Sequence, residues 1–162
     1  MAKVFLQDIV DELQMASDEQ FSYVDRQTGK VEMVSREVLG VAEEGGTVDD
    51  VLDWEEHQFE VAQAIFADWD RFEKLPTKYD IHDWEIMREF AESVEPERFS
   101  DDLQKAIRGA GAFRYFKDTL RRHRREKEWY AFRDEALRQI AIDWCEEHGI
   151  EYTEGRSLGA EG

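Results

Sequence analysis

A glycine-rich turn followed by a basic helix contains the residues whose types and spacing are best suited to binding a ligand. Gly109 and Gly111 precede a predicted helix that carries Arg114, Lys117 and Arg121 at steps of three and four residues. Glycines let backbone N–H groups approach an anion at a helix start, where the helix dipole favours negative charge. These five residues are our candidates for binding a phosphate group or another anion.

The same turn also has a plainer explanation as a tight connection between two helices. Glycines supply the unusual backbone angles and the close packing that such a connection needs. The dinucleotide-binding motif requires a third glycine and a preceding strand, and both are absent from this stretch. We favour the tight turn and keep the anion site as a candidate.

A basic run, Arg121-Arg-His-Arg-Arg125 followed by Lys127, has a composition that can contact nucleic-acid phosphates. However, Glu126 and Glu128 lie beside it, and the formal net charge of −18 repels a polyanion. We therefore expect these arginines to pair with carboxylates of the same domain or of a second subunit. We do not expect a nucleic-acid partner.

Asp80, His82, Asp83 and Glu85 could form a metal or acid–base cluster, because helical spacing brings His82 and Glu85 near one another. Capping explains the same residues without chemistry. Asp80 can be the N-cap of a helix over residues 81–94, with Asp83 in its first turn. We favour the capping role, and we predict no metal and no cofactor.

Cys145 is the only cysteine, which excludes an internal disulfide and a multi-cysteine metal site. It lies beside Trp144 on the apolar stripe of the last predicted helix, and Glu146 and Glu147 follow it. A catalytic thiolate needs exposure and nearby positive charge. We therefore expect Cys145 to lie in the core, together with the tryptophans.

Charge is distributed unevenly along the chain. Residues 1–104 carry 9 Lys and Arg against 28 Asp and Glu, residues 105–138 carry 11 against 5, and residues 139–162 carry 1 against 6. An acidic field attracts a basic protein, so we expect a protein partner with a basic surface. The basic block, residues 105–138, either pairs within its own domain or faces a partner.

Periodicity predicts an α+β fold: a predominantly helical single domain over residues 1–150, with an N-terminal antiparallel β-hairpin. The hairpin runs from Phe21 to Ser35, and Gly29 supplies the positive φ of its short loop. Six or seven helices are expected, and four of them cover residues 35–44, 54–69, 81–94 and 129–148. Residues 151–162, rich in Gly, Ser and Glu, are expected to be a disordered acidic tail.

The sequence also favours a cytoplasmic protein. It contains no apolar run of the ~18 residues that a membrane span requires, so we expect no membrane association. Asp8 falls where a signal peptide would place its apolar stretch.

Two blocks of the sequence are distinctive: Gly109-Ala-Gly-Ala-Phe-Arg-Tyr-Phe-Lys-Asp118 and Trp129-Tyr-Ala-Phe-Arg-Asp-Glu-Ala136. With further blocks at 6–13, 22–23, 28–29, 80–87 and 144–150, the chain resembles a bacterial family of uncharacterised proteins, the group numbered 0158 in the uncharacterised-protein-family series. The resemblance spans about residues 3–150. Ala110 and Tyr115 depart from the family, which usually carries basic residues there. The resemblance implies a small acidic bacterial α+β protein and no particular reaction.

Two functions follow from these features. The first is a non-catalytic binding or regulatory module that recognises a protein partner with a basic surface. The second is a phosphate- or nucleotide-binding protein, either a simple binder or an enzyme, with the anion at the turn from Gly109 to Lys117. The sequence contains no recognisable nucleophile–base pair, so we favour the first function and leave catalysis open.

Overall fold

The chain folds into two compact units, which we describe separately. The computed structural model describes residues 2–157. Of these, the first unit holds residues 2–81 and 138–157, and the second holds residues 82–137. Helices dominate the described residues and one small antiparallel sheet accompanies them, so the predicted α+β class is confirmed. A single domain over residues 1–150 stays a prediction. None of the described helices is both long and apolar enough to cross a membrane.

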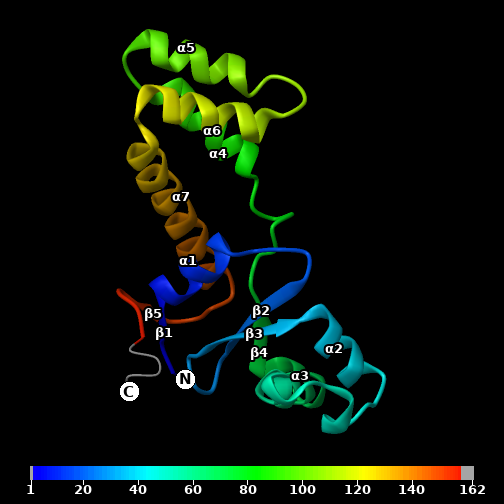
Figure 1. The fold of residues 1–162 in the computed structure, drawn as a ribbon. Helices are drawn as coiled ribbons and strands as arrows, with labels where there is room; N and C mark the ends of the chain where they lie inside the picture. Colours follow the sequence, from blue (N-terminus) through cyan, green and yellow to red (C-terminus); the bar gives the residue numbers. More distant parts are fainter. Residues whose placement is uncertain (1, 158–162) are drawn as a thin grey trace. The chain divides into compact units, whose positions relative to one another are not determined.

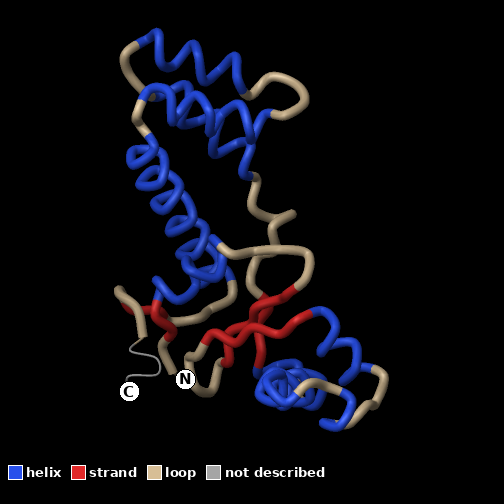
Figure 2. The backbone as a smooth tube through the Cα atoms, viewed as in Figure 1, coloured by secondary structure: helices blue, strands red, loops and turns tan. Residues whose placement is uncertain are grey.

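A three-stranded antiparallel sheet is the main sheet of the first unit (Figure 2). The strand β2 (Gln20–Asp25) pairs with β3 (Val31–Ser35) on one side and with β4 (Phe72–Lys74) on the other. β2 and β3 form the predicted hairpin, which is confirmed. β4 is absent from the predicted elements, because three residues are too few to display the two-residue period of a strand. This third strand supplies the support that an isolated hairpin lacks.

Part of the segment predicted as a tail is a strand. β5 (Tyr152–Thr153) pairs in parallel with β1 (Val4–Phe5) near the start of the chain. Arg156 donates two hydrogen bonds of 2.8 and 2.9 Å to the carboxylate of Asp11. Backbone pairing and this ion pair therefore hold residues 152–156 against the first unit. The last part of the predicted tail, residues 158–162, lies outside the described residues.

Helices α2 (Arg36–Glu43) and α3 (Glu56–Ala67) pack against the main sheet (Figure 1), whereas α1 (Leu6–Gln14) follows β1. Ser35 caps the start of α2, because its hydroxyl accepts a hydrogen bond of 3.1 Å from the backbone N–H of Val38. Short 3₁₀ turns cover residues 48–50, 53–55 and 69–71. Burial of apolar side chains between sheet and helices drives this packing. The buried set comprises Tyr23, Val34, Val38, Phe59, Val61, Ala62, Ile65 and Phe72.

The long helix α7 (Glu126–Glu147) ends in the first unit as the sequence predicts. Gly149 adopts a φ of +66°, and the backbone N–H of Ile150 donates to the carbonyl of Cys145 at 2.8 Å. This is the Schellman ending, which satisfies the last helical carbonyls. The indole N–H of Trp144 donates to the carbonyl of Lys74 at 3.2 Å and joins this helix end to β4.

Phe90 lies at the centre of the second unit, which consists of α4 (Asp83–Ser93), α5 (Glu97–Ala106), α6 (Ala112–His123) and the first part of α7. Its ring makes edge-on contacts at centroid distances of 5.2 to 6.4 Å with four others: Phe99, Phe116, Trp129 and Phe132. Edge-on pairs are favourable because the positive edge of one ring meets the negative face of the other. The aromatic contacts thus join all four helical segments.

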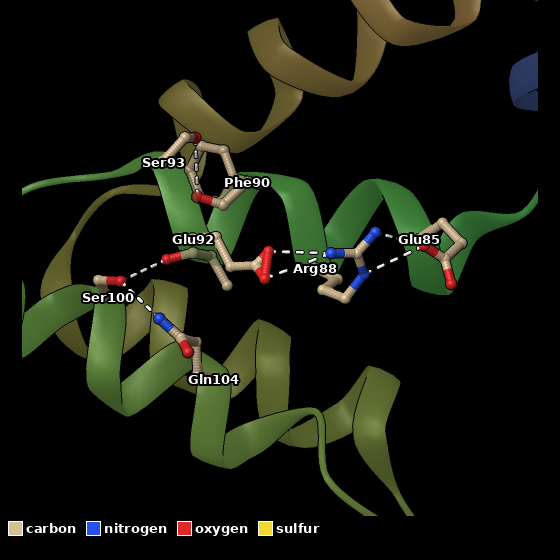
Figure 3. Close-up of polar contacts among 8 residues, drawn as sticks. Glu85, Arg88, Phe90, Glu92, Ser93, Ser100 and Gln104 are labelled. Carbon is tan, nitrogen blue, oxygen red and sulfur yellow. Dashed lines mark hydrogen bonds and ion pairs between the residues drawn. The ribbon is translucent and has the colours of Figure 1, made fainter.

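Ser100 ties α5 to α4 through a buried hydrogen bond (Figure 3). Its hydroxyl donates to the carbonyl of Ala91 at 2.5 Å, and the side-chain amide of Gln104 donates to the Ser100 hydroxyl oxygen at 2.9 Å. Both bonding roles of the buried hydroxyl are therefore filled, which a buried polar group requires.

Asp25 is a buried carboxylate at the end of β2, only 4% exposed. Arg71 donates to both of its oxygens, at 2.9 and 2.7 Å, and the backbone N–H of Gln27 adds a third hydrogen bond at 2.9 Å. Burial alone raises the pKa of Asp25, but the hydrogen bonds from Arg71 and Gln27 outweigh it and hold the pKa below its ordinary value. Asp25 thereby joins the hairpin loop to the segment that leads into β4.

We expect Asp25→Asn to lower the free energy of unfolding at neutral pH by about 1–3 kcal/mol, because Arg71 loses its charged acceptor. The folded-state pKa of Asp25 lies below the unfolded value. Its contribution is therefore present above about pH 4 and is lost as the pH falls through the folded-state pKa. Chemical denaturation at neutral and acidic pH measures this difference, which should shrink in acid.

Asp49→Asn is the matched control, since Asp49 is exposed and forms no ion pair within the described residues. An equal loss of stability in this control, or a loss from Asp25→Asn that stays constant in acid, would contradict the assignment.

Candidate functional site

The residues predicted to bind an anion lie at the turn between α5 and α6. Gly109 and Gly111 adopt left-handed backbone angles, with φ of +83° and +77°, and Gly111 directly precedes α6. All three predicted cations are exposed on α6: Arg114, Lys117 and Arg121. Asp118 lies 4.0 Å from Arg114 and 3.5 Å from Arg121. The five residues share one turn and helix, and anion binding by them stays a prediction.

A shallow depression of about 450 Å³ lies between α5 and a different stripe of α6. None of the five predicted residues lines it. The α6 stripe repeats at steps of three and four residues, which places its members on one side of the helix. The lining consists of Asp102, Lys105, Ala106 and Arg108 from the α5 side and Tyr115, Asp118, Thr119 and Arg122 from α6.

The charges in this depression are only partly balanced. Nε2 of His123 lies 2.9 Å from a carboxylate oxygen of Asp102, and Arg122 lies 3.8 Å from the same oxygen. The contact with His123 holds the pKa of Asp102 below its ordinary value. In contrast, Lys105 and Arg108 form no ion pair within the described part of the chain. Sequence reasoning missed these two cations, although their spacing of three residues in the basic block was a signal.

Tyr115 forms an aromatic wall of the depression. A Cβ atom added to Gly111 would lie 3.0 Å from Cε2 of the tyrosine ring, so the glycine makes room for this ring. The hydroxyl of the buried Thr119 donates to the Tyr115 carbonyl at 2.8 Å. The tyrosine is 53% exposed, which leaves part of its ring open to solvent. Gly111 thus serves both the turn and the placement of Tyr115.

A second unusual surface is the acidic segment, residues 37–70, which comprises most of α2, α3 and the 3₁₀ turns beside them. It carries eleven Asp and Glu and no Lys or Arg. Ten of the carboxylates are exposed, and Glu55 is buried. Within the described residues none of the eleven forms an ion pair with Lys or Arg. The segment therefore presents a concentrated and unbalanced negative charge.

The acidic segment also exposes large apolar side chains. Trp54 is 71% exposed, Trp69 61% and Leu52 57%. The prediction that the tryptophans lie in the core is wrong for Trp54, for Trp69 and for Trp84, which is 40% exposed; it is confirmed for Trp129 and Trp144. For Trp54 and Trp69 the reason is local: α3 covers only Glu56–Ala67, so both lie beyond its ends and off its buried stripe.

Charge separates strongly between the two units. The second unit, residues 82–137, carries 12 Lys and Arg against 13 Asp and Glu, whereas the rest of the chain carries 9 against 26. Nearly all of the net charge therefore belongs to the first unit. Most of the basic block of the sequence therefore lies in a unit that is almost neutral overall.

The acidic residues between 80 and 85 are engaged in the fold. Asp80 accepts hydrogen bonds within the preceding turn, and α4 begins only at Asp83, so the prediction of Asp80 as the helix N-cap is wrong. Asp83 pairs with Arg133 at 3.3 Å, and Glu85 pairs with Arg88 at 2.7 Å (Figure 3). The described residues include no group of three His, Cys, Asp or Glu that could hold a metal ion.

Cys145 is fully buried, as the sequence predicts. Burial raises the pKa of its thiol to about 11, and the neighbouring charge of Glu146 acts in the same direction. The protonated thiol is a poor nucleophile. His148, three residues later, lies 2.9 Å from Glu73. Cys145 therefore packs in the core, and His148 contacts Glu73.

We expect Cys145 in the folded protein to react with an aromatic disulfide reagent at least about a hundredfold more slowly than in the denatured protein, because reaction requires exposure and a thiolate. Absorbance of the released thiol measures both rates. The denatured protein is the control for reagent and stoichiometry. Rapid reaction in the folded state would show that Cys145 is accessible.

Two glycine substitutions separate backbone strain from the placement of Tyr115. We expect Gly109→Ala and Gly111→Ala each to lower stability by about 1–2 kcal/mol, because alanine resists the left-handed conformation. A Cβ at Gly109 meets no atom within 4 Å, so only Gly111→Ala should also displace the tyrosine ring. Urea denaturation measures the stability, and NMR shifts of the Tyr115 ring measure its environment. Equal ring shifts in both variants would contradict the packing role of Gly111.

Comparison with known proteins supports the resemblance seen in the sequence. The model of one family, described as Uncharacterised protein family (UPF0158), matches residues 3–161, which is nearly the whole chain. No curated protein and no solved structure matches the chain. The family description names no activity.

Proposed function

The chain belongs to the Uncharacterised protein family (UPF0158), and we propose that it is a non-catalytic binding module that recognises a basic protein surface. The binding surface is the acidic segment, residues 37–70. The observation that carries this proposal is the combination, in one segment, of exposed tryptophans with ten exposed carboxylates that form no Lys or Arg ion pair within the described residues. Charge and apolar area together are what a specific protein interface uses.

The unpaired carboxylates supply attraction and orientation. Opposite charge on a partner speeds diffusional encounter, and it discriminates against partners of like charge. The carboxylates have no Lys or Arg to give up within the described residues, so a basic partner displaces no existing ion pair. This absence of competition favours an intermolecular role for the segment.

The exposed apolar side chains would contribute binding free energy when a partner buries them. Trp54 and Leu52 lie two residues apart and are both more than half exposed. Tryptophan is among the residues most enriched at the energetic centres of interfaces, and exposed clusters of large apolar side chains mark interaction sites. A partner helix or strand with basic residues beside an apolar stripe fits this combination.

The residues with catalytic potential favour binding over catalysis. Cys145 is buried, and the pairings of Asp83 and Glu85 place them within the network of the second unit. The buried Cys145 lacks the accessibility that nucleophilic catalysis requires.

The proposal is tested with a cationic amphipathic peptide, whose binding is followed by fluorescence anisotropy at rising salt. We expect the triple variant Asp53→Asn, Glu56→Gln and Glu60→Gln to bind about tenfold more weakly at low salt, because three attractive contacts are lost. The difference should diminish as salt screens the charges.

The matched control removes three exposed carboxylates elsewhere that form no ion pair within the described part of the chain: Glu89→Gln, Glu146→Gln and Glu147→Gln. It should bind within about twofold of the parent, since it changes only the overall field. Trp54→Ala should weaken binding about tenfold or more, whereas Tyr130→Ala, which removes a 54% exposed aromatic side chain from the second unit, should not. Equal losses in target and control variants, or no binding at low salt, would overturn the proposal.

A further inference from the structure

We infer that the depression between α5 and α6 binds a nucleotide, with its phosphates on Lys105 and Arg108 and its base against Tyr115. This site lies wholly within the second unit, and it does not depend on the acidic segment of the first unit. It also differs from the turn at Gly109 and Gly111, because another stripe of α6 lines it.

The unbalanced cations identify the charge of the ligand. Lys105 and Arg108 stand on the same stretch of chain, three residues apart, and neither has a carboxylate partner within the described residues. An arginine and a lysine without partners at one wall of a depression suit a phosphate, which accepts several charge-assisted hydrogen bonds. A carboxylate ligand offers fewer acceptor atoms for the same two side chains.

The carboxylates of the depression do not cancel this attraction. Asp102 is shared by His123 and Arg122, at 2.9 and 3.8 Å. Asp118 is shared in the same way by Arg114 and Arg121 on the outer side of α6. Each carboxylate thus has two basic neighbours, and the local balance stays positive.

The exposed ring of Tyr115 identifies the second part of the ligand. Gly111 leaves space for the ring, so the turn before α6 helps to place this side chain. Aromatic side chains beside basic residues stack nucleobases, and such stacking is tolerant of base identity. A phosphate ligand without a base would make no stacking contact with the Tyr115 ring.

The size of the depression agrees with a ligand of this class. Its volume of about 450 Å³ lies within the range of about 300–1,000 Å³ typical of small-molecule sites. The depression is shallow, so the ligand keeps much of its contact with water. The same chemistry can come from a free nucleotide or from one nucleotide of a single strand, and the experiment distinguishes these sources.

Isothermal titration of the full-length protein tests the inference with ADP, inorganic tripolyphosphate and a short single-stranded RNA, all without divalent ions. Arg108→Ala should weaken ADP binding about tenfold or more, because a hydrogen bond between charged groups is lost. Tyr115→Ala should weaken ADP binding about tenfold and leave tripolyphosphate unchanged, and Tyr115→Phe should retain binding.

Lys127→Ala is the matched control, since it removes the same charge from the same unit outside the depression. It should change ADP binding by less than about twofold. Tighter binding of RNA than of ADP, with the same sensitivity to Arg108→Ala, would support the site and assign it to a nucleotide within a strand. Circular dichroism confirms that each variant is folded.

Three results would overturn the inference. One is no binding of either ADP or RNA at low salt. Another is an equal loss from Arg114→Ala and Arg108→Ala, which would place the anion at the glycine turn. The third is self-association of the parent protein that Arg108→Ala abolishes while ADP has no effect, which would identify Lys105 and Arg108 as a contact for an acidic protein surface.

Discussion

The shortage of basic residues is the constraint on which the arrangement of this protein depends. The chain has 39 Asp and Glu and 21 Lys and Arg, so many carboxylates must remain without a cationic partner. In the first unit, five of the nine basic side chains form ion pairs that join separate segments: Arg26, Arg71, Lys78, Arg138 and Arg156. They hold the sheet and the last described residues of the chain. The acidic segment, residues 37–70, has no Lys or Arg of its own, and its carboxylates form no ion pair with Lys or Arg within the described residues.

The second unit distributes a nearly balanced charge in a different way. Its aromatic core around Phe90 fixes α5 beside α6, and this contact brings the basic end of one helix next to a polar stripe of the other. Asp102 and Asp118 each have two basic neighbours, which leaves Lys105 and Arg108 in surplus. Screening at physiological salt acts over about 8 Å, so each surface presents its own local charge more than the net charge of the chain. A basic protein and a phosphate ligand are therefore compatible with one molecule.

Features set by neighbouring residues could be predicted from the sequence. The hairpin follows from alternation on both sides of Gly29, and the start of α2 follows from the capping hydroxyl of Ser35. The ending of α7 at Gly149 and the burial of Cys145 follow from similarly local patterns. In each case the deciding interaction spans only a few residues, so the sequence displays both partners together.

The sequence by itself therefore determined the α+β class, the hairpin, the main helices and the uneven charge. Only the tertiary structure decided that β4 joins the hairpin, that Trp54 and Trp69 are exposed, and that Lys105 and Arg108 share a depression with Tyr115. The physical reason is the distance along the chain between the interacting groups. The helical spacing of apolar residues does not determine where a helix ends. The number of charged residues does not determine which cations form ion pairs. Both depend on packing between segments that are far apart in sequence.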